Sequence, residues 1–148
     1  LQHVGVLLRR SSPGHLFRGF NGDYSGYANV VRVANNYSAV TGACLMTPRA
    51  VFEEVGGLSL DFPLNFNDID YCLKVRAAGH RVVYDPDTVL LHFESSSRSS
   101  DVSPSELDRF QARWRYATWV DPYDNPNFHP ENVNMVPPIY HPDGTMLV

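Results

Sequence analysis

The sequence predicts an α/β layered domain, because a stretch with helical periodicity is followed at once by two stretches rich in β-branched residues. The helical stretch ends at Gly79, and the β-rich stretches cover residues 81–84 and 88–91. Two more apolar stretches, 1–8 and 37–46, have the composition of strands. Alternation of helices and strands is typical of domains in which helices cover a sheet.

Composition places the chain among ordinary globular proteins of one domain. It has 148 residues, 43% of them hydrophobic and 19% charged, which is enough to build a hydrophobic core. The formal net charge of −4 argues against a basic surface for nucleic acid. No apolar run is long enough to span a bilayer. The first residue is not Met, so we expect a fragment or a processed chain.

The two cysteines, Cys44 and Cys72, each lie in an apolar run. This position favours buried free thiols over a disulfide or a metal pair. Free thiols are typical of a reducing compartment. We therefore expect a cytoplasmic location, which includes the inner face of the membrane.

The central helix is predicted to begin at Asn67 or Asp68, since either side chain accepts hydrogen bonds from the unpaired N–H groups of a first turn. Asp70 and Lys74 form an acid–base pair at i,i+4 spacing. Gly79 supplies the left-handed residue that ends a helix. The side expected to be buried consists of Ile69, Cys72, Leu73 and Ala77.

Upstream of this helix we expect a long loop, two strands and a shorter helix. The loop covers residues 9–29 and contains His15 and Arg18, interpreted as solvated loop residues with a functional role as the alternative. The strands are 30–33 and 37–46. In the second strand Gly42 indicates either close approach of backbone or ligand, or close packing against a helix. The shorter helix is expected from Thr47–Pro48 to the glycines at 56 and 57.

Downstream we expect one more helix and an extended tail. Ser103 and Glu106 have the spacing of a capping box, with a proline at the first helical position. The helix is predicted to run to about Trp119, with Leu107, Phe110 and Trp114 on its inner face. Residues 121–148 are rich in proline and asparagine and show no periodicity. This composition predicts a tail that wraps a surface or contacts a partner.

Asp68 is a candidate general base. The helix dipole favours a charged carboxylate at a helix N-terminus, and an ionised carboxylate takes a proton from an attacking hydroxyl. The alternative is an acid that only stabilises the helix, and the residue pattern by itself favours this alternative. Asp68 and Asp70 have D-x-D spacing, but side chains two apart on a helix diverge by roughly 200°. We therefore do not expect this pair to form a metal site.

His92 lies at the end of an apolar run and is either a metal ligand or a structural histidine. A single histidine favours the structural interpretation. The sequence contains no metalloprotease helix motif, no paired C-x-x-C, no phosphate-binding glycine loop and no nucleophile elbow. An unrelated metal-dependent hydrolase is disfavoured, since the other histidines are scattered.

Four segments together resemble the C-terminal half of the family 2 glycosyltransferases. They are NYSAVTGACLMTPRAVFEEVGG, FNDIDYCLKVRAAGHRVVYDP, LLHFESSSR and DPYDNPNF, and they occur in family order with family-like gaps. The opening LQHVGVLL and the following HLFRG are similar to the same group. The resemblance extends from residue 1 to about residue 128.

The resemblance implies a partial GT-A fold, a mixed sheet flanked by helices, with the N-terminal nucleotide-binding half absent. It also implies an inverting transfer of a sugar from a nucleotide-sugar donor to the hydroxyl of a glycan or other acceptor. A sugar hydroxyl is a poor nucleophile and needs a base. The resemblance gives this role to Asp68. The leaving nucleoside diphosphate is charged, so a divalent metal, manganese or magnesium, is expected in the full-length enzyme.

The resemblance also assigns the surrounding residues. His92 falls on a metal ligand of several family members. The residues matched to substrate-binding positions are Thr41, Gly42, Ala43, Asn67, Asp70 and Arg98. The first three match the segment that lines the sugar and acceptor pocket. Asn67 and Asp70 flank the base, and Arg98 lies where some members contact the diphosphate.

The chain departs from the family pattern in two respects. The half with the family's own metal-binding D-x-D is missing, and Phe93 stands where many relatives have a second histidine. We therefore expect residues 1–120 to form the acceptor-side half of the domain and to be inactive alone. The alternative is a non-catalytic module that binds carbohydrate or protein. A divided sheet exposes an edge, so we also expect self-association, possible homo-oligomers, or a tail that covers the exposed face.

Overall fold

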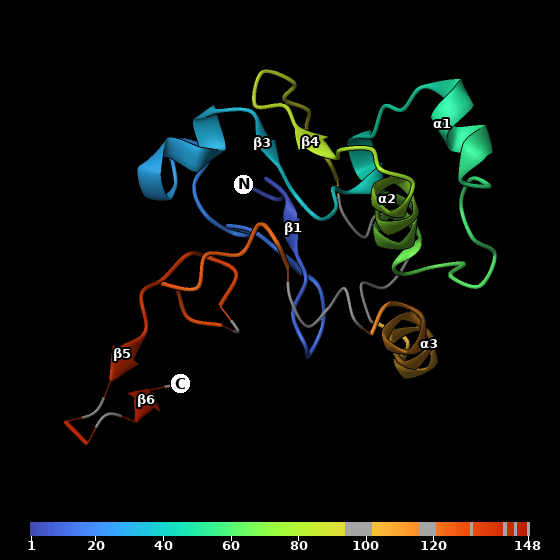
Figure 1. The fold of residues 1–148 in the computed structure, drawn as a ribbon. Helices are drawn as coiled ribbons and strands as arrows, with labels where there is room; N and C mark the ends of the chain where they lie inside the picture. The colour runs from blue at the N-terminus through green and yellow to red at the C-terminus, as the bar shows by residue number, and fades with distance from the viewer. Residues whose placement is uncertain (94–101, 116–120, 131, 141, 144, 148) are drawn as a thin grey trace.

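A computed structural model describes residues 1–93, 102–115, 121–130, 132–140, 142–143 and 145–147 (Figure 1). Three α-helices, two 3₁₀ helices and six short strands occur in this part of the chain. In chain order they are β1 Val6–Leu7, β2 Gly14–His15, η1 Tyr27–Arg32, β3 Asn35–Asn36, η2 Gly42–Cys44, α1 Arg49–Glu54, α2 Asn67–Ala77, β4 Val83–Tyr84, α3 Pro104–Trp114, β5 Ile139–Tyr140 and β6 Met146–Leu147.

The strands form three antiparallel pairs rather than one broad sheet in the described residues. The pairs are β1–β2, β3–β4 and β5–β6. Val6 lies opposite His15 in the first pair, and an isolated bridge joins Val6 to Ala39 just after β3. The structure is thus a small mixture of helices and short antiparallel strands, as a partial glycosyltransferase domain would be. The larger mixed sheet of the GT-A fold is not confirmed.

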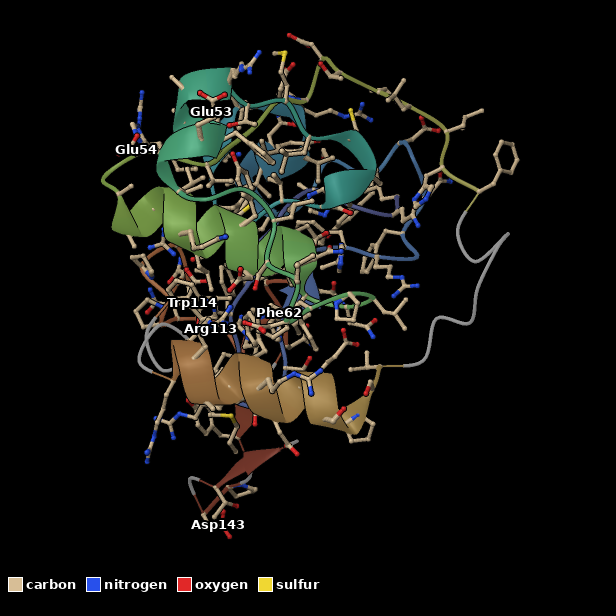
Figure 2. All side chains as sticks on the ribbon, turned by 90° about the vertical axis from the view of Figure 1, so that its right-hand side faces the viewer. Glu53, Glu54, Phe62, Arg113, Trp114 and Asp143 are labelled. Carbon is tan, nitrogen blue, oxygen red and sulfur yellow. The ribbon has the colours of Figure 1, made fainter. Side chains whose placement is uncertain are left out.

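The main hydrophobic core lies where α2 packs against α3 and β1. Phe110 on α3 is fully buried, stacks on Phe66 with ring centroids 4.9 Å apart, and meets Phe62 edge-on. Figure 2 shows Phe62, Arg113 and Trp114 between the green helix α2 and the brown helix α3. The prediction that Phe110 marks the inner face of the last helix is confirmed.

A second core cluster joins the first strands to the beginning of the tail. Its buried members are Val4, Leu7, Leu16, Phe17, Val31 and Tyr37. Tyr123, Val133 and Met135 from the tail pack against them. The β5–β6 hairpin, by contrast, projects from the rest of the molecule, with Asp143 at its tip (Figures 1 and 2).

Polar contacts hold the beginning of the tail in place. The buried carboxylate of Asp121 accepts hydrogen bonds from Leu8 N at 2.7 Å and from Ser38 Oγ at 2.7 Å. The guanidinium of Arg9 donates to both carboxylate oxygens of Asp124, at 2.6 and 3.1 Å. These contacts tie residues after 120 to the segments that follow β1 and β3. The domain boundary at residue 120 stays a prediction.

The structure corrects several details of the predicted elements. Residues 30–33 were expected to form a strand, but residues 27–32 form η1, in which Ala28 and Asn29 have positive φ. Residues 88–91 are not in a strand. The expected strand 37–46 is replaced by the bridge at Ala39 followed by η2. The β-rich composition of these segments was therefore a poor guide to pairing, which depends on a partner strand.

Two helix predictions were wrong at the level of single residues. Ala77 is exposed rather than buried. The capping box at Ser103 does not form. The Ser103 side chain makes no cap hydrogen bond, and the Glu106 carboxylate accepts from Asn65 instead. Helix α3 is described only as far as Trp114, so its predicted extension to Trp119 lies outside the described residues.

The cysteine prediction was right for one thiol and wrong for the other. Both are free, and Cys72 is buried against the core, where it donates to Val40 O. Burial raises the pKa of Cys72 to about 11, so this thiol stays protonated and unreactive near neutral pH. Cys44 is exposed.

Helix α2 begins with a residue that the sequence did not mark. Phe66 is its N-cap, with φ 62° and ψ 1°, a left-handed conformation that is unusual for a bulky side chain. Stacking on Phe110 holds its ring in the core. Just before it, Glu106 of α3 accepts from Leu64 N at 3.1 Å, Asn65 N at 3.3 Å and Asn65 Nδ2 at 2.8 Å. Helix α3 therefore fixes the turn from which α2 starts.

Glu106→Ala is expected to lower the free energy of unfolding by about 3 kcal/mol, because hydrogen bonds to a charged group contribute roughly 1.5–3 kcal/mol each and the part-buried donors of Leu64 and Asn65 would lose their acceptor. Glu106→Gln keeps an acceptor oxygen and should lose about half as much. Urea unfolding of the wild type and both variants at neutral pH measures the two losses.

The same variants give a pH test. Burial raises the pKa of Glu106, but the donors on Asn65 and Leu64 outweigh it, and the pKa lies below the ordinary 4.5. A carboxylate with a lowered folded-state pKa contributes stability above its unfolded value and loses it as pH falls through the folded value. The stability difference between wild type and Glu106→Gln should therefore shrink below pH 4.5. A difference that stays constant with pH would contradict this assignment.

The segment after β4 exposes a row of large apolar side chains. Val89 is 80% exposed, Leu91 88% and Phe93 80%. No helix of the described part of the chain is long and apolar enough to cross a membrane.

We expect residues 1–148 in isolation to self-associate and to bind an apolar dye through this segment. Val89→Lys combined with Leu91→Lys should reduce both signals. Leu60→Lys, at an equally exposed position elsewhere, should change them less. Light scattering and dye fluorescence measure the effect, and a wild-type monomer without dye binding would disprove the prediction.

Candidate active site

The site is centred on Asp68, in the first turn of α2. Its carboxylate is half-buried, and both oxygens accept backbone hydrogen bonds. Oδ2 accepts from Gly42 N at 2.8 Å, and Oδ1 accepts from Ile69 N at 2.9 Å. One donor belongs to the helix and the other to a turn 26 residues earlier in the chain. The carboxylate is thereby held in one orientation where two segments meet.

The turn at Thr41–Ala43 uses all three of its backbone N–H groups inside the protein. Thr41 N donates to His3 Nε2 at 3.2 Å, Gly42 N donates to Asp68, and Ala43 N donates to Thr41 Oγ1 at 3.3 Å. Gly42 and Ala43 are nevertheless exposed. A ligand at this exposed turn would therefore find none of these three N–H groups unpaired.

Glycine at residue 42 leaves room for the turn to pass close to Asp68. A Cβ at this position would lie 3.2 Å from Asp68 Cβ and 3.7 Å from Asp68 Oδ2. The sequence left open whether Gly42 served a close backbone approach or packing against a helix. In the structure Gly42 allows a close backbone approach and also packs against a helix, since its neighbour is the first turn of α2.

Gly42→Ala is expected to reduce kcat of the intact protein about tenfold, because the added methyl group shifts Asp68 by a few tenths of an ångström and misplaced catalytic groups lose rate steeply. Stability should fall by less than about 1 kcal/mol, since the residue is exposed. Steady-state kinetics and thermal unfolding measure the two effects. Gly22→Ala makes the same change at a glycine with no atom within 4 Å of the added Cβ, and this matched control should leave kcat unchanged. Equal kcat values for wild type and Gly42→Ala would refute the close-approach argument.

The two residues beside Asp68 lie in different surroundings. Asn67 is half-buried, and its Oδ1 accepts from Asp68 N at 2.7 Å, so it helps to fix the helix start. Asp70 is fully buried. Its Oδ1 accepts from Trp114 Nε1 at 2.8 Å and from Arg113 Nη1 at 3.2 Å, which anchors α2 to α3. Substrate contact by Asp70 would require these two helices to separate.

His92 is exposed, and a contact with Gln2 orients its ring. Its Nδ1 lies 3.0 Å from Gln2 Oε1, and since a carbonyl oxygen only accepts, Nδ1 carries the proton. The Nε2 lone pair is then available to a metal. Metal-binding histidines usually donate the N–H of their other ring nitrogen in this way. Within the described residues, however, no three His, Cys, Asp or Glu side chains gather in a way that could hold a metal ion. Arg98 lies outside the described residues.

Two residues at the start of the chain connect the parts of this site, and the sequence did not indicate either. Gln2 contacts His92, and His3 contacts Thr41, whose neighbour Gly42 contacts Asp68. Asp68 and His92, expected at the two ends of one functional stretch, are thus linked through a short series of contacts. The only signal in the sequence was a pair of polar residues at the beginning of an apolar run.

Comparison with known proteins identifies the class to which this site belongs. The family described as "Glycosyltransferase like family 2" matches residues 25–117, a range that contains Asp68, the Thr41–Ala43 turn and His92. The chain belongs to the family 2 glycosyltransferases. The resemblance seen in the sequence motifs is therefore confirmed.

Two longer curated proteins are similar to the chain. The "Uncharacterized protein y4gI" of Sinorhizobium fredii is 39% identical over 147 residues, which is 92% of this chain and 16% of that protein. The "O-antigen biosynthesis protein RfbC" of Myxococcus xanthus is 34% identical over 132 residues, which is 88% of this chain and 10% of that protein. The chain thus spans only a small part of either relative. No solved structure matches the chain.

Proposed function

We propose that the chain is the acceptor-side part of an inverting glycosyltransferase in which Asp68 is the catalytic base. The observation that carries the proposal is the placement of Asp68: a half-buried carboxylate at the start of a helix, held by Gly42 N–H beside an exposed turn. Both elements of this arrangement, the Thr41–Ala43 turn and Asp68, lie within residues 25–117, the range matched to the family.

The chemistry of the proposed reaction follows from this placement. An acceptor hydroxyl gives its proton to the Asp68 carboxylate while its oxygen attacks the anomeric carbon of the donor sugar. The bond from that carbon to the diphosphate oxygen breaks, and its electron pair leaves with the nucleoside diphosphate. Attack opposite to the leaving group inverts the anomeric carbon. Hydrogen bonds from Gly42 and Ile69 fix the carboxylate for this proton transfer.

The proposal gives different roles to the neighbouring residues. Gly42 and Ala43 contact the sugar or the acceptor through their exposed surface, with Thr41 shaping the turn. Asn67 holds the helix start and contacts the acceptor, and Arg98 contacts the diphosphate. Asp70 is proposed to act indirectly, by fixing α2 against α3 beneath the site.

A divalent metal, manganese or magnesium, remains a proposal for the intact enzyme. Nε2 of His92 is the proposed ligand, because the contact with Gln2 orients its ring. The described residues do not form a complete metal site by themselves. His92→Ala should weaken metal-dependent stimulation of transfer if this imidazole is one of the ligands.

The biological setting is proposed from the relative that carries a functional name. The Myxococcus xanthus protein is named for O-antigen biosynthesis. We infer that the intact protein acts in bacterial cell-surface polysaccharide synthesis, at the cytoplasmic side of the membrane. Because most donor contacts would lie outside residues 1–148, we also propose that this chain alone is inactive.

The test is a screen of the intact protein against a panel of nucleotide sugars, with manganese or magnesium, for acceptor-dependent release of nucleoside diphosphate. The expected result is release with one donor and a product whose anomeric configuration is opposite to that of the donor. Release with retained configuration would remove the inverting mechanism. No release with any donor, together with binding of a glycan, would favour the non-catalytic binding module.

A further inference from the structure

A histidine pair lies directly behind the turn that contacts Asp68. His3 precedes β1 and His15 ends β2, and the pairing of these two strands brings the rings together. Their Nδ1 atoms are 3.0 Å apart, and the rings meet edge to face with centroids 5.1 Å apart. On its other side, His3 Nε2 accepts the hydrogen bond from Thr41 N.

The contacts of His3 define its protonation. Nε2 accepts from a backbone N–H, so it carries no proton, and a neutral imidazole then has its proton on Nδ1. That proton is donated to Nδ1 of His15. Burial, reinforced by the neighbouring His15, lowers the pKa of His3 from 6.5 to about 3. His3 is therefore neutral, in one tautomer, throughout the pH range in which proteins work.

We propose that His3 is a positioning residue of the transferase site, which holds Thr41 and thereby fixes the Gly42 N–H that orients the Asp68 carboxylate. Thr41 and Gly42 are adjacent, so displacement of one amide moves the next. The series runs from His15 through His3, Thr41 and Gly42 to Asp68. The effect on turnover rests on the proposed function, whereas the effect on the turn does not.

Amide hydrogen exchange in the intact protein tests the structural part. His3→Leu removes the acceptor and should accelerate exchange of both Thr41 and Gly42 by about tenfold, as expected for loss of one part-buried hydrogen bond. His3→Gln places an oxygen near the position of Nε2 and should keep both rates near wild type. In His3→Asn the side chain is too short to reach Thr41, so this variant should behave like His3→Leu. It serves as the test if the leucine variant does not fold.

Two controls make the exchange result specific. His80→Leu removes a histidine that contacts Glu54 on another surface, and it should leave both amides unchanged. The ring-nitrogen shifts of ¹⁵N-labelled histidine should show His3 with its proton on Nδ1 down to pH 4.5. Acceleration at Thr41 without acceleration at Gly42, or equal rates in the Gln and Leu variants, would overturn the proposal.

Kinetics test the functional part. His3→Leu should lower kcat about tenfold with little change in the KM for the donor, and His3→Gln should restore most of kcat. A merely destabilising change would not be rescued in this way. If the intact protein transfers no sugar at all, the proposed function fails while the exchange data still decide the role of His3. Normal kcat in an active His3→Leu enzyme would overturn the role in turnover and leave the proposed function standing.

Discussion

Asp68→Asn is expected to lower kcat of the intact protein by about 10³-fold, because general base catalysis contributes roughly 10²–10⁴-fold and an amide does not accept the proton. The amide is almost the same size as the carboxylate, but it has a single acceptor oxygen, so it keeps the hydrogen bond from Gly42 N or the one from Ile69 N and loses the other. We expect this loss to cost about 1 kcal/mol of stability, which leaves the variant folded, and donor affinity should change little. Transfer kinetics, together with a binding titration of the donor, measure the two quantities.

The matched control is Asp108→Asn, which makes the same chemical change at an exposed position of α3. It should leave kcat unchanged. A variant at Asp68 that keeps more than about a tenth of the wild-type kcat would assign the base elsewhere and return Asp68 to the role of a helix-stabilising acid.

Phe110→Ala is expected to give the largest loss of stability in the chain, about 3–5 kcal/mol. The side chain is fully buried and packs on both Phe62 and Phe66. Its removal also frees Phe66, whose left-handed conformation depends on surrounding contacts. Activity should fall beyond the effect of unfolding, because Phe66 lies two residues before Asp68. Urea unfolding and kinetics at a temperature where the variant is folded measure both losses.

Phe110→Leu keeps an apolar side chain and should lose less stability, which keeps the prediction testable if the alanine variant does not fold. Phe93→Ala, at a position 80% exposed, is the control and should change stability by less than about 0.5 kcal/mol. A comparable loss in Phe93→Ala and Phe110→Ala would contradict the assignment of the core.

Sequence reasoning succeeded where the determinants are local. The extent of α2 follows from helical periodicity and from Gly79, which has φ 89° in the structure. The start of α3 follows from Pro104 at its first position. The position of Asp68 in the first turn of α2 also follows from the sequence, whereas its role as the base stays a proposal.

It failed where a contact comes from a distant segment. Glu106 has the spacing of a capping box, but three donors before α2 compete for its carboxylate, and no local pattern reveals them. Asn67 and Asp68 look like caps, yet the cap is Phe66, which is stabilised by Phe110 from 44 positions further along the chain. The link from His3 to Thr41 spans 38 positions and has no signature of its own.

The β-rich composition of residues 88–91 predicts a strand, but strands form only against a partner. In the described residues this segment has none, and Val89 and Leu91 are exposed instead. Composition therefore identified residues that favour a sheet without identifying what pairs with them.

The central claim is that the Thr41–Ala43 turn and Asp68 form one catalytic unit across 26 positions of the chain. A double-mutant cycle on kcat with Gly42→Ala, Asp68→Asn and the double variant tests it most directly. If the turn acts only by placing the carboxylate, the double variant should be as slow as Asp68→Asn alone, about 10³-fold below wild type. A double variant slower by a further tenfold would show that the two effects are independent, and would contradict the claim.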